Sequence, residues 1–395
     1  MAWWCCKVRR LKKLALFAAL ASLALEYATK REICGFSSLS GYIVTVVGFL
    51  NLWFPGPKKG YCNLLGGYIQ SIPEHRRSAE QLKLARWGGF SLAASAMRRH
   101  LDDVEVCREC AGFFCSMANF NRESSLIAGR SDAIAVLLDA MWRHPNDAGF
   151  QAQASASMGC WCDWTPETEE KVASLGGPQA ILKALQTFPD DAHVQFLGWA
   201  GLSSVSNRLD SKRIIMEAGA LNTGMEIMRD PVLGKGHRVR QEIIMTFANL
   251  AANCDECAAA MMGTGDIIQQ VLKAMREEEP DAERGTMTDG IQLMMELART
   301  NLTSRRAITD AGFIPVTLEA MKRFPKVHPQ AADTWPLVEI ALQLLVSLSE
   351  DNKEAQAEMV KAGAEDVISM VIDSEPKVWQ RRRVGGVLIS RFQEL

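Results

Sequence analysis

The sequence lacks a dominant charge. Its 44 lysine and arginine residues nearly balance 46 aspartate and glutamate residues, which leaves a formal net charge of −2. Proteins that bind nucleic acid through its phosphates, or anionic membranes through their headgroups, carry an excess of positive charge. The balance therefore argues against nucleic acid as a partner.

The sequence also lacks the short motifs of common enzymes. No glycine-rich phosphate loop, H-E-x-x-H zinc motif or G-x-S-x-G nucleophile turn occurs in it. Two C-x-x-C pairs are present, Cys107/Cys110 and Cys254/Cys257, but they lie about three repeat lengths apart and neither has further ligands nearby in sequence. We predict that these are buried free cysteines. We predict no metal, no cofactor, no small-molecule substrate and no enzymatic activity.

Charge is absent from one stretch near the N-terminus. No charged residue lies between Glu32 and Lys58, which leaves 25 uncharged positions in succession. About 20 apolar residues are enough to cross the hydrocarbon core of a bilayer. We predict a transmembrane helix over 35–55, anchored by Tyr42, Val46, Phe49, Leu52, Trp53 and Phe54. The alternative is a buried strand or a core helix of a water-soluble domain.

Small residues on this segment predict close packing against another helix in the membrane. Ser37 and Gly41 are spaced four residues apart, and Gly48 lies two turns further on. The preceding stretch, 10–29, is apolar with basic flanks and is predicted either to span the bilayer or to lie at its interface. We assign 1–72 to a membrane segment and 73–395 to a separate domain.

The basic, apolar N-terminus predicts the location of the protein. If it is retained, it favours an internal import signal, as in the mitochondrial inner membrane, over a cleaved leader. A plastid or another intracellular membrane is the alternative.

From about residue 77 the chain repeats itself. Glycines separate apolar helical runs at intervals of 42 to 51 residues, at Gly129, Gly177, Gly219, Gly265, Gly312 and Gly363. Periods of about 40 to 47 residues are typical of helical solenoids. Each repeat is predicted to contain a short helix, a glycine turn, an amphipathic helix and a long apolar helix. In the last repeat, the three helices are expected at 352–361, 364–373 and 377–392.

This three-helix pattern resembles the armadillo repeat. The stretch Phe247-Ala248-Asn249-Leu250 matches the ending of the third helix in that family. The resemblance covers roughly 79–395, or about seven repeats. It implies an all-α fold, a right-handed superhelix in which the third helices line a concave surface, and the binding of partners on that surface.

The expected concave surface departs from that of the peptide-binding members. The importin-alpha-like members clamp a peptide with an asparagine ladder, each asparagine preceded by a tryptophan one turn earlier. The aligned positions here hold one asparagine, and no tryptophan stands four residues before any of them, so binding of nuclear-localisation peptides is not implied. We predict a partner surface lined by Ser116, Cys160, Ser204, Asn249, Glu296 and Ser347. The alternative is that these residues simply pack one third helix against the next.

Together these features predict a non-catalytic, membrane-anchored scaffold. We expect an accessory or assembly subunit of an organellar membrane complex, with the lipid bilayer and other subunits as its partners. The alternative is a soluble or peripheral adaptor that binds a protein or peptide on the concave face.

Overall fold

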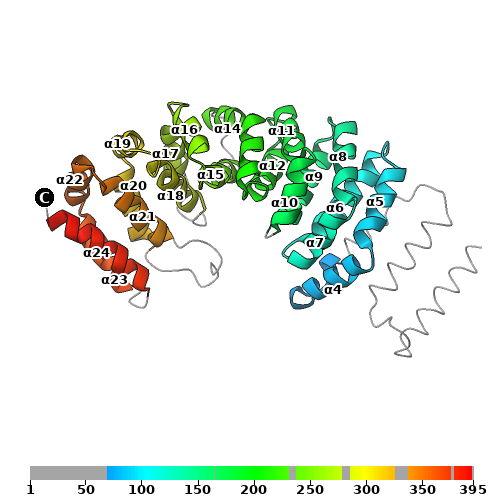
Figure 1. Cartoon of the computed structure of the whole chain (residues 1–395), viewed down its shortest axis with the longest axis horizontal. Coiled ribbons are helices and arrows are strands. Elements are labelled where there is room, and N and C mark those ends of the chain that lie inside the picture. Colours follow the sequence, from blue (N-terminus) through cyan, green and yellow to red (C-terminus); the bar gives the residue numbers. More distant parts are fainter. Residues whose placement is uncertain are drawn as a thin grey trace, which may run out of the picture. The chain divides into compact units, whose positions relative to one another are not determined.

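The structure is a computed structural model. It describes residues 69–163, 165–230, 237–277, 285–324, 337–374 and 378–393 (Figure 1). Within these ranges every regular element is a helix. This confirms the prediction of an all-α fold.

The helices α4 to α24 group into seven sets of three in the described part of the chain. The first helices of the sets are α4 (Glu74–Arg86), α7 (Arg122–Arg130), α10 (Pro166–Ser174), α13 (Leu209–Glu217), α16 (Asp255–Met262), α19 (Leu302–Asp310) and α22 (Lys353–Lys361). The second helices are α5 (Gly89–Arg99), α8 (Ala133–Arg143), α11 (Gly177–Thr187), α14 (Ala220–Arg229), α17 (Ile267–Glu277), α20 (Phe313–Arg323) and α23 (Ala364–Ser374). The third helices are α6 (Val104–Ala118), α9 (Ala148–Cys162), α12 (Ala192–Ser204), α15 (His237–Ala251), α18 (Gly285–Ala298), α21 (Leu337–Ser349) and α24 (Trp379–Gln393).

Side-chain caps and left-handed turns mark where these helices begin and end. The Asp103, Asp147 and Asp191 carboxylates accept backbone N–H bonds at the first turn of α6, α9 and α12. Between the first and second helices of most repeats, a glycine adopts a positive φ, as Gly219 does at 94°. Glycine meets this requirement without the Cβ clash that other residues suffer.

The chain forms two compact bodies. The first, here the N-terminal body, extends to Thr168, and the second, the C-terminal body, begins at Glu169. In the N-terminal body, α6 packs beside α9 and α5 beside α8. In the C-terminal body the third helices α12, α15, α18, α21 and α24 pack in succession. In each body the third helices thus form one layer, and the second helices pack against it.

Aromatic clusters fill the core between these layers. The rings of Phe90, Phe114 and Trp161 contact one another, with centroids 6.2 Å apart for Phe90 and Phe114, 5.4 Å for Phe114 and Trp161, and 6.5 Å for Phe90 and Trp161. In the C-terminal body, Trp199 meets Phe247 edge to face at 6.1 Å. All five side chains are fully buried. A buried aromatic ring contributes both its large apolar area and the geometry of its contacts.

Buried polar side chains tie the second helix to the third in three repeats. The Gln151 amide donates to the backbone carbonyls of Met141 (2.8 Å) and His144 (3.0 Å). Gln195 does the same ten and seven residues back along its own repeat, and Arg381 donates to Val371 at the equivalent position. The last carbonyls of a helix have no partner within it. These side chains supply the missing donors and fix the angle between the two helices.

The predicted membrane elements, 10–29 and 35–55, and their residues lie outside the described residues. Residues 69–72, which the sequence assigned to the membrane segment, belong to the described fold, where Ile69 and Ile72 are buried. Among the described helices, none combines the length and the apolarity that a membrane span requires. The handedness of the superhelix stays a prediction.

Candidate functional site: the outer face of the third helices

Each predicted partner residue lies on a third helix: Ser116 and Cys160 on α6 and α9 of the N-terminal body, and Ser204, Asn249, Glu296 and Ser347 on α12, α15, α18 and α21 of the C-terminal body. Five of them, Ser116, Cys160, Ser204, Asn249 and Ser347, are half-buried, and Glu296 is 8% exposed. Each of the six residues belongs to a different repeat.

Their polar groups mostly bond within the layer. The Ser116 and Ser204 hydroxyls donate to carbonyls of their own helices, at Gly112 and Ala200. The Asn249 amide donates to Ser203 Oγ on the neighbouring helix at 2.9 Å. Glu296 accepts from Arg299 one turn later. This geometry resembles helix packing more than a ladder of free amides, and binding at these residues stays a prediction.

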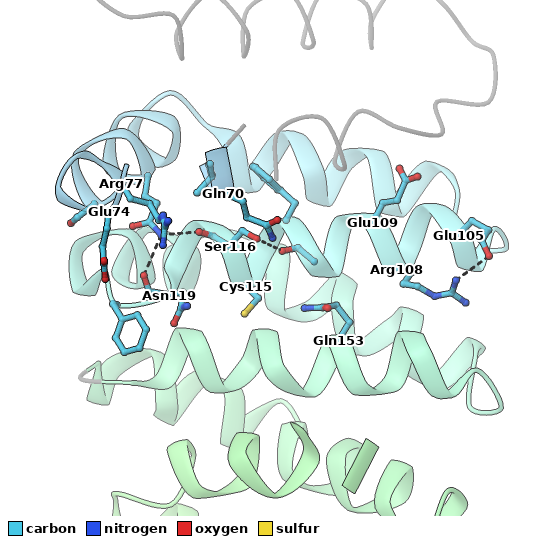
Figure 2. A pocket seen from close by; sticks show the side chains of 16 residues that line it. Gln70, Glu74, Arg77, Glu105, Arg108, Glu109, Cys115, Ser116, Asn119 and Gln153 are labelled. Atoms are coloured by element: carbon cyan, nitrogen blue, oxygen red, sulfur yellow. Dashed lines mark hydrogen bonds and ion pairs between the residues drawn. The ribbon is translucent and has the colours of Figure 1, made fainter. Parts of the chain in front are cut away.

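The N-terminal body carries an open cavity that sequence reasoning missed. Its volume is about 720 Å³, and it lies where α4, α6 and α9 meet. Figure 2 shows labelled side chains from these elements around it, including the predicted residue Ser116. The lining is mixed: two arginines and three glutamates accompany amides and one thiol. Its principal polar residues are Gln70, Arg77, Arg108, Cys115, Asn119 and Gln153.

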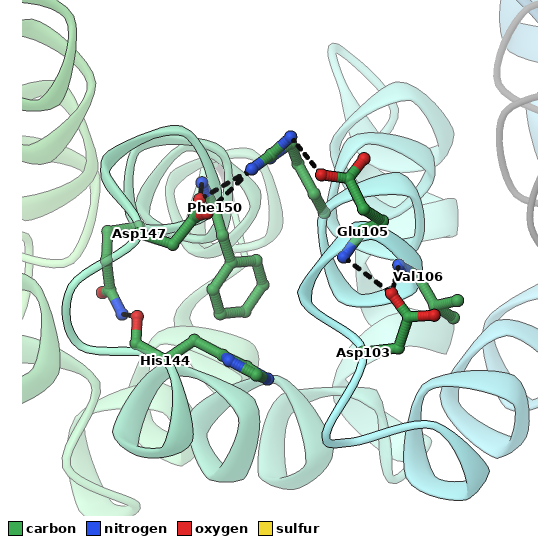
Figure 3. Close-up of polar contacts among 8 residues, drawn as sticks. Asp103, Glu105, Val106, His144, Asp147 and Phe150 are labelled. Atoms are coloured by element: carbon green, nitrogen blue, oxygen red, sulfur yellow. Dashed lines mark hydrogen bonds and ion pairs between the residues drawn. The ribbon is translucent and has the colours of Figure 1, made fainter.

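Arg108 joins the two third helices at one end of this cavity. Its guanidinium bonds Asp147 at 2.8 Å, across from α6 to the N-terminus of α9, and Glu105 at 3.1 Å on its own helix. Figure 3 shows Asp147 and Asp103 at the starts of α9 and α6. The hydrogen bond that Arg108 donates to Asp147 raises the pKa of Arg108. Burial alone would raise the pKa of Asp147, but the Phe150 N–H and Arg108 outweigh it and lower that pKa.

Hydrogen bonds from side-chain amides close the other end of the cavity. The Gln81 amide on α4 donates to the carbonyls of Ser116 (2.8 Å) and Asn119 (3.2 Å) at the end of α6. Asn121 in turn donates to Gln81 Oε1. Because these donors satisfy the last carbonyls of α6, the cavity wall is held by hydrogen bonds between repeats.

Phe120 lies at the cavity rim with an exposed side chain and a backbone conformation that is rare for its residue type. It is 86% exposed and has a φ of 55°, in the left-handed region. Asn253 and Asp351 occupy the same turn in later repeats, with φ of 54° and 53°. Asparagine and aspartate tolerate this region, whereas a bulky side chain is strained there. Phe120 therefore costs folding energy and exposes a large apolar surface.

The C-terminal body has a smaller hollow between α21 and α24. Its volume is about 260 Å³, and Gln343, Gln380 and Arg383 line it together with the edge of Glu339. Glu339 forms a buried ion pair with Arg381 at 2.7 Å, the two being 6% and 1% exposed. A buried pair of this kind fixes the register of neighbouring helices more than it adds stability.

The cysteines differ in part from the prediction. Cys107 and Cys110 are buried thiols, as predicted. The prediction was wrong for Cys254 and Cys257, which form a disulfide. Cys254 caps α16, and its sulfur accepts the Cys257 N–H at 3.3 Å, so the first helical turn brings the two sulfurs to the same side. The i, i+3 spacing carries the signal for this disulfide, because it places both thiols on one face of a helix.

Comparison with solved structures supports the fold. An engineered protein superposes with a TM-score of 0.72 at 17% identity, covering 89% of this chain and 79% of that one. A structure from a study of the interaction between cadherin and beta-catenin gives 0.66 at 18% identity, covering 90% and 66%. A designed armadillo repeat protein gives 0.51 at 16% identity, covering 64% and 97%. No protein-family model matches the sequence, and no curated protein matches it.

The chain therefore has an armadillo-like fold, as its sequence pattern predicted. Within the described residues, no three histidine, cysteine, aspartate or glutamate side chains gather as a metal site.

Proposed function

We propose that this chain is a non-catalytic scaffold that binds a protein partner on the third-helix face of its N-terminal body. The observation that carries the proposal is Phe120, an exposed and strained aromatic at the rim of a 720 Å³ cavity. Backbone strain at a surface position points to a role outside folding. Aromatic anchors next to hydrogen-bonding pockets dominate the energetics of many protein interfaces.

The cavity lining indicates the chemistry of this partner. Glu74 and Arg77 lie at one end of the cavity, and Glu105, Arg108 and Glu109 lie at the other, with amide side chains between them (Figure 2). Such a lining suits a polypeptide with charges of both signs and an apolar residue that meets Phe120. An armadillo repeat protein of designed sequence has been solved in complex with a peptide of alternating lysine and arginine. The mixed lining here favours a different peptide.

Co-purification tests this proposal. The tagged full chain is isolated from detergent-solubilised cells, and the chains that co-migrate with it on a native gel are identified. Phe120→Ala is expected to weaken capture by at least tenfold, because loss of an interface hot spot costs about 2 kcal/mol or more. Trp142→Ala is the matched control, since Trp142 is also an exposed aromatic, at 53%, but lies on α8 in the second-helix layer. Equal capture by both variants would refute the proposal.

We further propose that residues before Ile69 anchor the scaffold to a membrane. The support is the run of 25 uncharged positions, which is long enough to cross a bilayer. The test is extraction of membranes with alkaline carbonate, which releases peripheral proteins. Retention of the full chain in the pellet is expected. Its complete release would favour the adaptor hypothesis instead.

An accessory subunit of an organellar membrane complex is the specific role that we propose for an anchored scaffold, with the mitochondrial inner membrane as its site. Deletion of 1–68 separates this role from that of an adaptor. The deletion ends before Ile69 because Ile69 and Ile72 are buried in the repeat fold. A subunit loses its complex on deletion, whereas an adaptor keeps its partner.

A further inference from the structure

Two free thiols meet between neighbouring third helices of the N-terminal body. The Ser157 hydroxyl of α9 donates to the Ala111 carbonyl of α6, and Cys160 and Cys115 follow these two residues by three and four positions on their helices. The two thiols therefore lie beside each other, and each shifts the pKa of the other. Both are free and half-buried, whereas Cys107, Cys110 and Cys162 are buried. Cys115 also lines the open cavity, where Figure 2 labels it. Small oxidants in solvent therefore have access to this pair.

The helices that carry the thiols are close together. Ser157 Oγ on α9 donates to the backbone carbonyl of Ala111 on α6 at 2.7 Å. The serine hydroxyl is only one bond from Cβ, so this hydrogen bond requires the backbones of α6 and α9 to lie close together. Ser125 Oγ on α7 holds the Cys160 carbonyl at 3.1 Å. A disulfide requires such an approach, with the two Cα atoms about 4.4 to 6.8 Å apart.

The two thiols also differ in acidity. The neighbouring Cys160 thiol lowers the pKa of Cys115. The Cys115 thiol in turn raises the pKa of Cys160, and burial raises the pKa of Cys160 further. The thiolate is the reactive form of cysteine, so the lower pKa makes Cys115 the better nucleophile of the two. Oxidation-sensitive cysteines commonly combine access to solvent, thiolate character and a second thiol beside them.

We propose that Cys115 and Cys160 form a reversible, peroxide-sensitive disulfide that joins α6 to α9 beside the cavity. The Cys115 thiolate attacks one oxygen of hydrogen peroxide, the O–O bond breaks, and the departing hydroxide takes a proton to become water. Cys160 sulfur then attacks the Cys115 sulfenic acid, the S–O bond breaks, and the hydroxide leaves as water with the Cys160 proton. Two thiols and one peroxide thus give one disulfide and two waters.

A metal site is the other chemistry open to two thiols, and the surroundings do not favour it. Zinc takes four ligands, three of them from the protein even in open sites. Among the described residues, no third histidine, cysteine or carboxylate completes a set around this pair. Disulfide formation needs only the two sulfurs.

The test is peptide mapping of the full-length protein after brief treatment with hydrogen peroxide. Unreacted thiols are blocked with iodoacetamide before digestion without reductant. The expected product is a Cys115–Cys160 cross-linked peptide that dithiothreitol converts back to two peptides. Failure of this peptide to form while circular dichroism shows a folded protein would overturn the proposal, as would pairing of Cys115 with any other cysteine.

Single-cysteine variants separate the two roles. Cys160→Ser is expected to lose the cross-link and to leave Cys115 as a sulfenic acid that dimedone traps. Cys115→Ser is expected to lose both products. Cys162→Ser is the matched control, because Cys162 lies two residues away on the same helix but is buried, and it should keep the cross-link. Dimedone labelling of Cys160 in place of Cys115 would refute the assigned roles.

Discussion

Replacement of Gln195 by leucine tests whether buried amides set the geometry of the repeats. The Gln195 amide donates to Leu185 O (2.8 Å) and Phe188 O (3.0 Å), and its oxygen accepts from the Trp199 indole at 3.1 Å. Leucine has a similar volume but no polar atom. The substitution therefore removes three hydrogen bonds and leaves their partners buried, while it adds little steric change.

The size of the effect follows from these three bonds. Each contributes about 1 kcal/mol net, and a buried group left without a partner costs about 1 to 3 kcal/mol. Some of this loss is recovered because the leucine side chain is apolar. We expect Gln195→Leu to lower the local unfolding free energy by about 3 kcal/mol, equivalent to roughly a hundredfold in the opening equilibrium.

Hydrogen exchange with mass spectrometry measures this change where it occurs. The amides of α11 and α12 should exchange roughly a hundredfold faster, because local opening sets their protection. Gln179→Leu, an exposed position on α11, is the matched control and should change stability by less than about 0.5 kcal/mol. Equal exchange in the two variants would show that the buried amide does not hold α11 against α12.

Four further substitutions give measurable changes in stability. Phe120→Asn should stabilise the fold by about 1 kcal/mol in urea unfolding, because asparagine tolerates the left-handed φ of 55°; a loss of stability would show that Phe120 packs favourably. Burial raises the pKa of Glu242 to about 7, so the stability of the fold should fall as the pH rises from near 4.5 to about 7. Glu242→Gln should flatten this pH dependence in thermal melts at several pH values. Gly224→Ala would place a methyl group 2.5 Å from Phe247, and we expect a loss of about 2 kcal/mol; Gly386→Ala, which meets nothing within 4 Å, should gain up to about 1 kcal/mol.

Helix boundaries in the last repeat were predicted well because two signals agree there. The sequence placed its helices at 352–361, 364–373 and 377–392, and the structure has Lys353–Lys361, Ala364–Ser374 and Trp379–Gln393. Asn352 caps the first helix, and Gly363 adopts the expected positive φ of 72°. Periodicity and turn chemistry thus point to the same boundaries.

Two of the earlier turns were predicted at the wrong residue, because glycine was the only signal there. Gly176 has the positive φ, and Gly177 already begins α11, so the predicted anchor is shifted by one residue. Gly129 lies inside α7, where a Cβ would come within 2.4 Å of Thr168 Oγ1. Gly129 therefore allows α7 to pack closely against α10, which carries Thr168. Sequence spacing alone does not distinguish a turn glycine from a packing glycine.

The thiol pair shows why the site was harder to predict than the fold. The repeat alignment placed Cys160 opposite Ser116, whereas the structure pairs it with Cys115. Neighbouring third helices are staggered, so a shift of one residue decides which side chains face each other. That stagger depends on tertiary packing, which repeat length does not encode. The alignment thus missed this contact.

The residues that we propose for binding and oxidation are separate from the residues that hold the second and third helices together. Gln151, Gln195 and Arg381 hold the second helices from one side of the layer. Phe120 and Cys115 lie at the cavity on the other side. Neither takes part in the bonds that set the angle between the second and third helices. Because the two sets do not overlap, substitutions at the cavity should change binding or oxidation while the packing of the layers stays the same, so loss of a partner can be attributed to the surface itself.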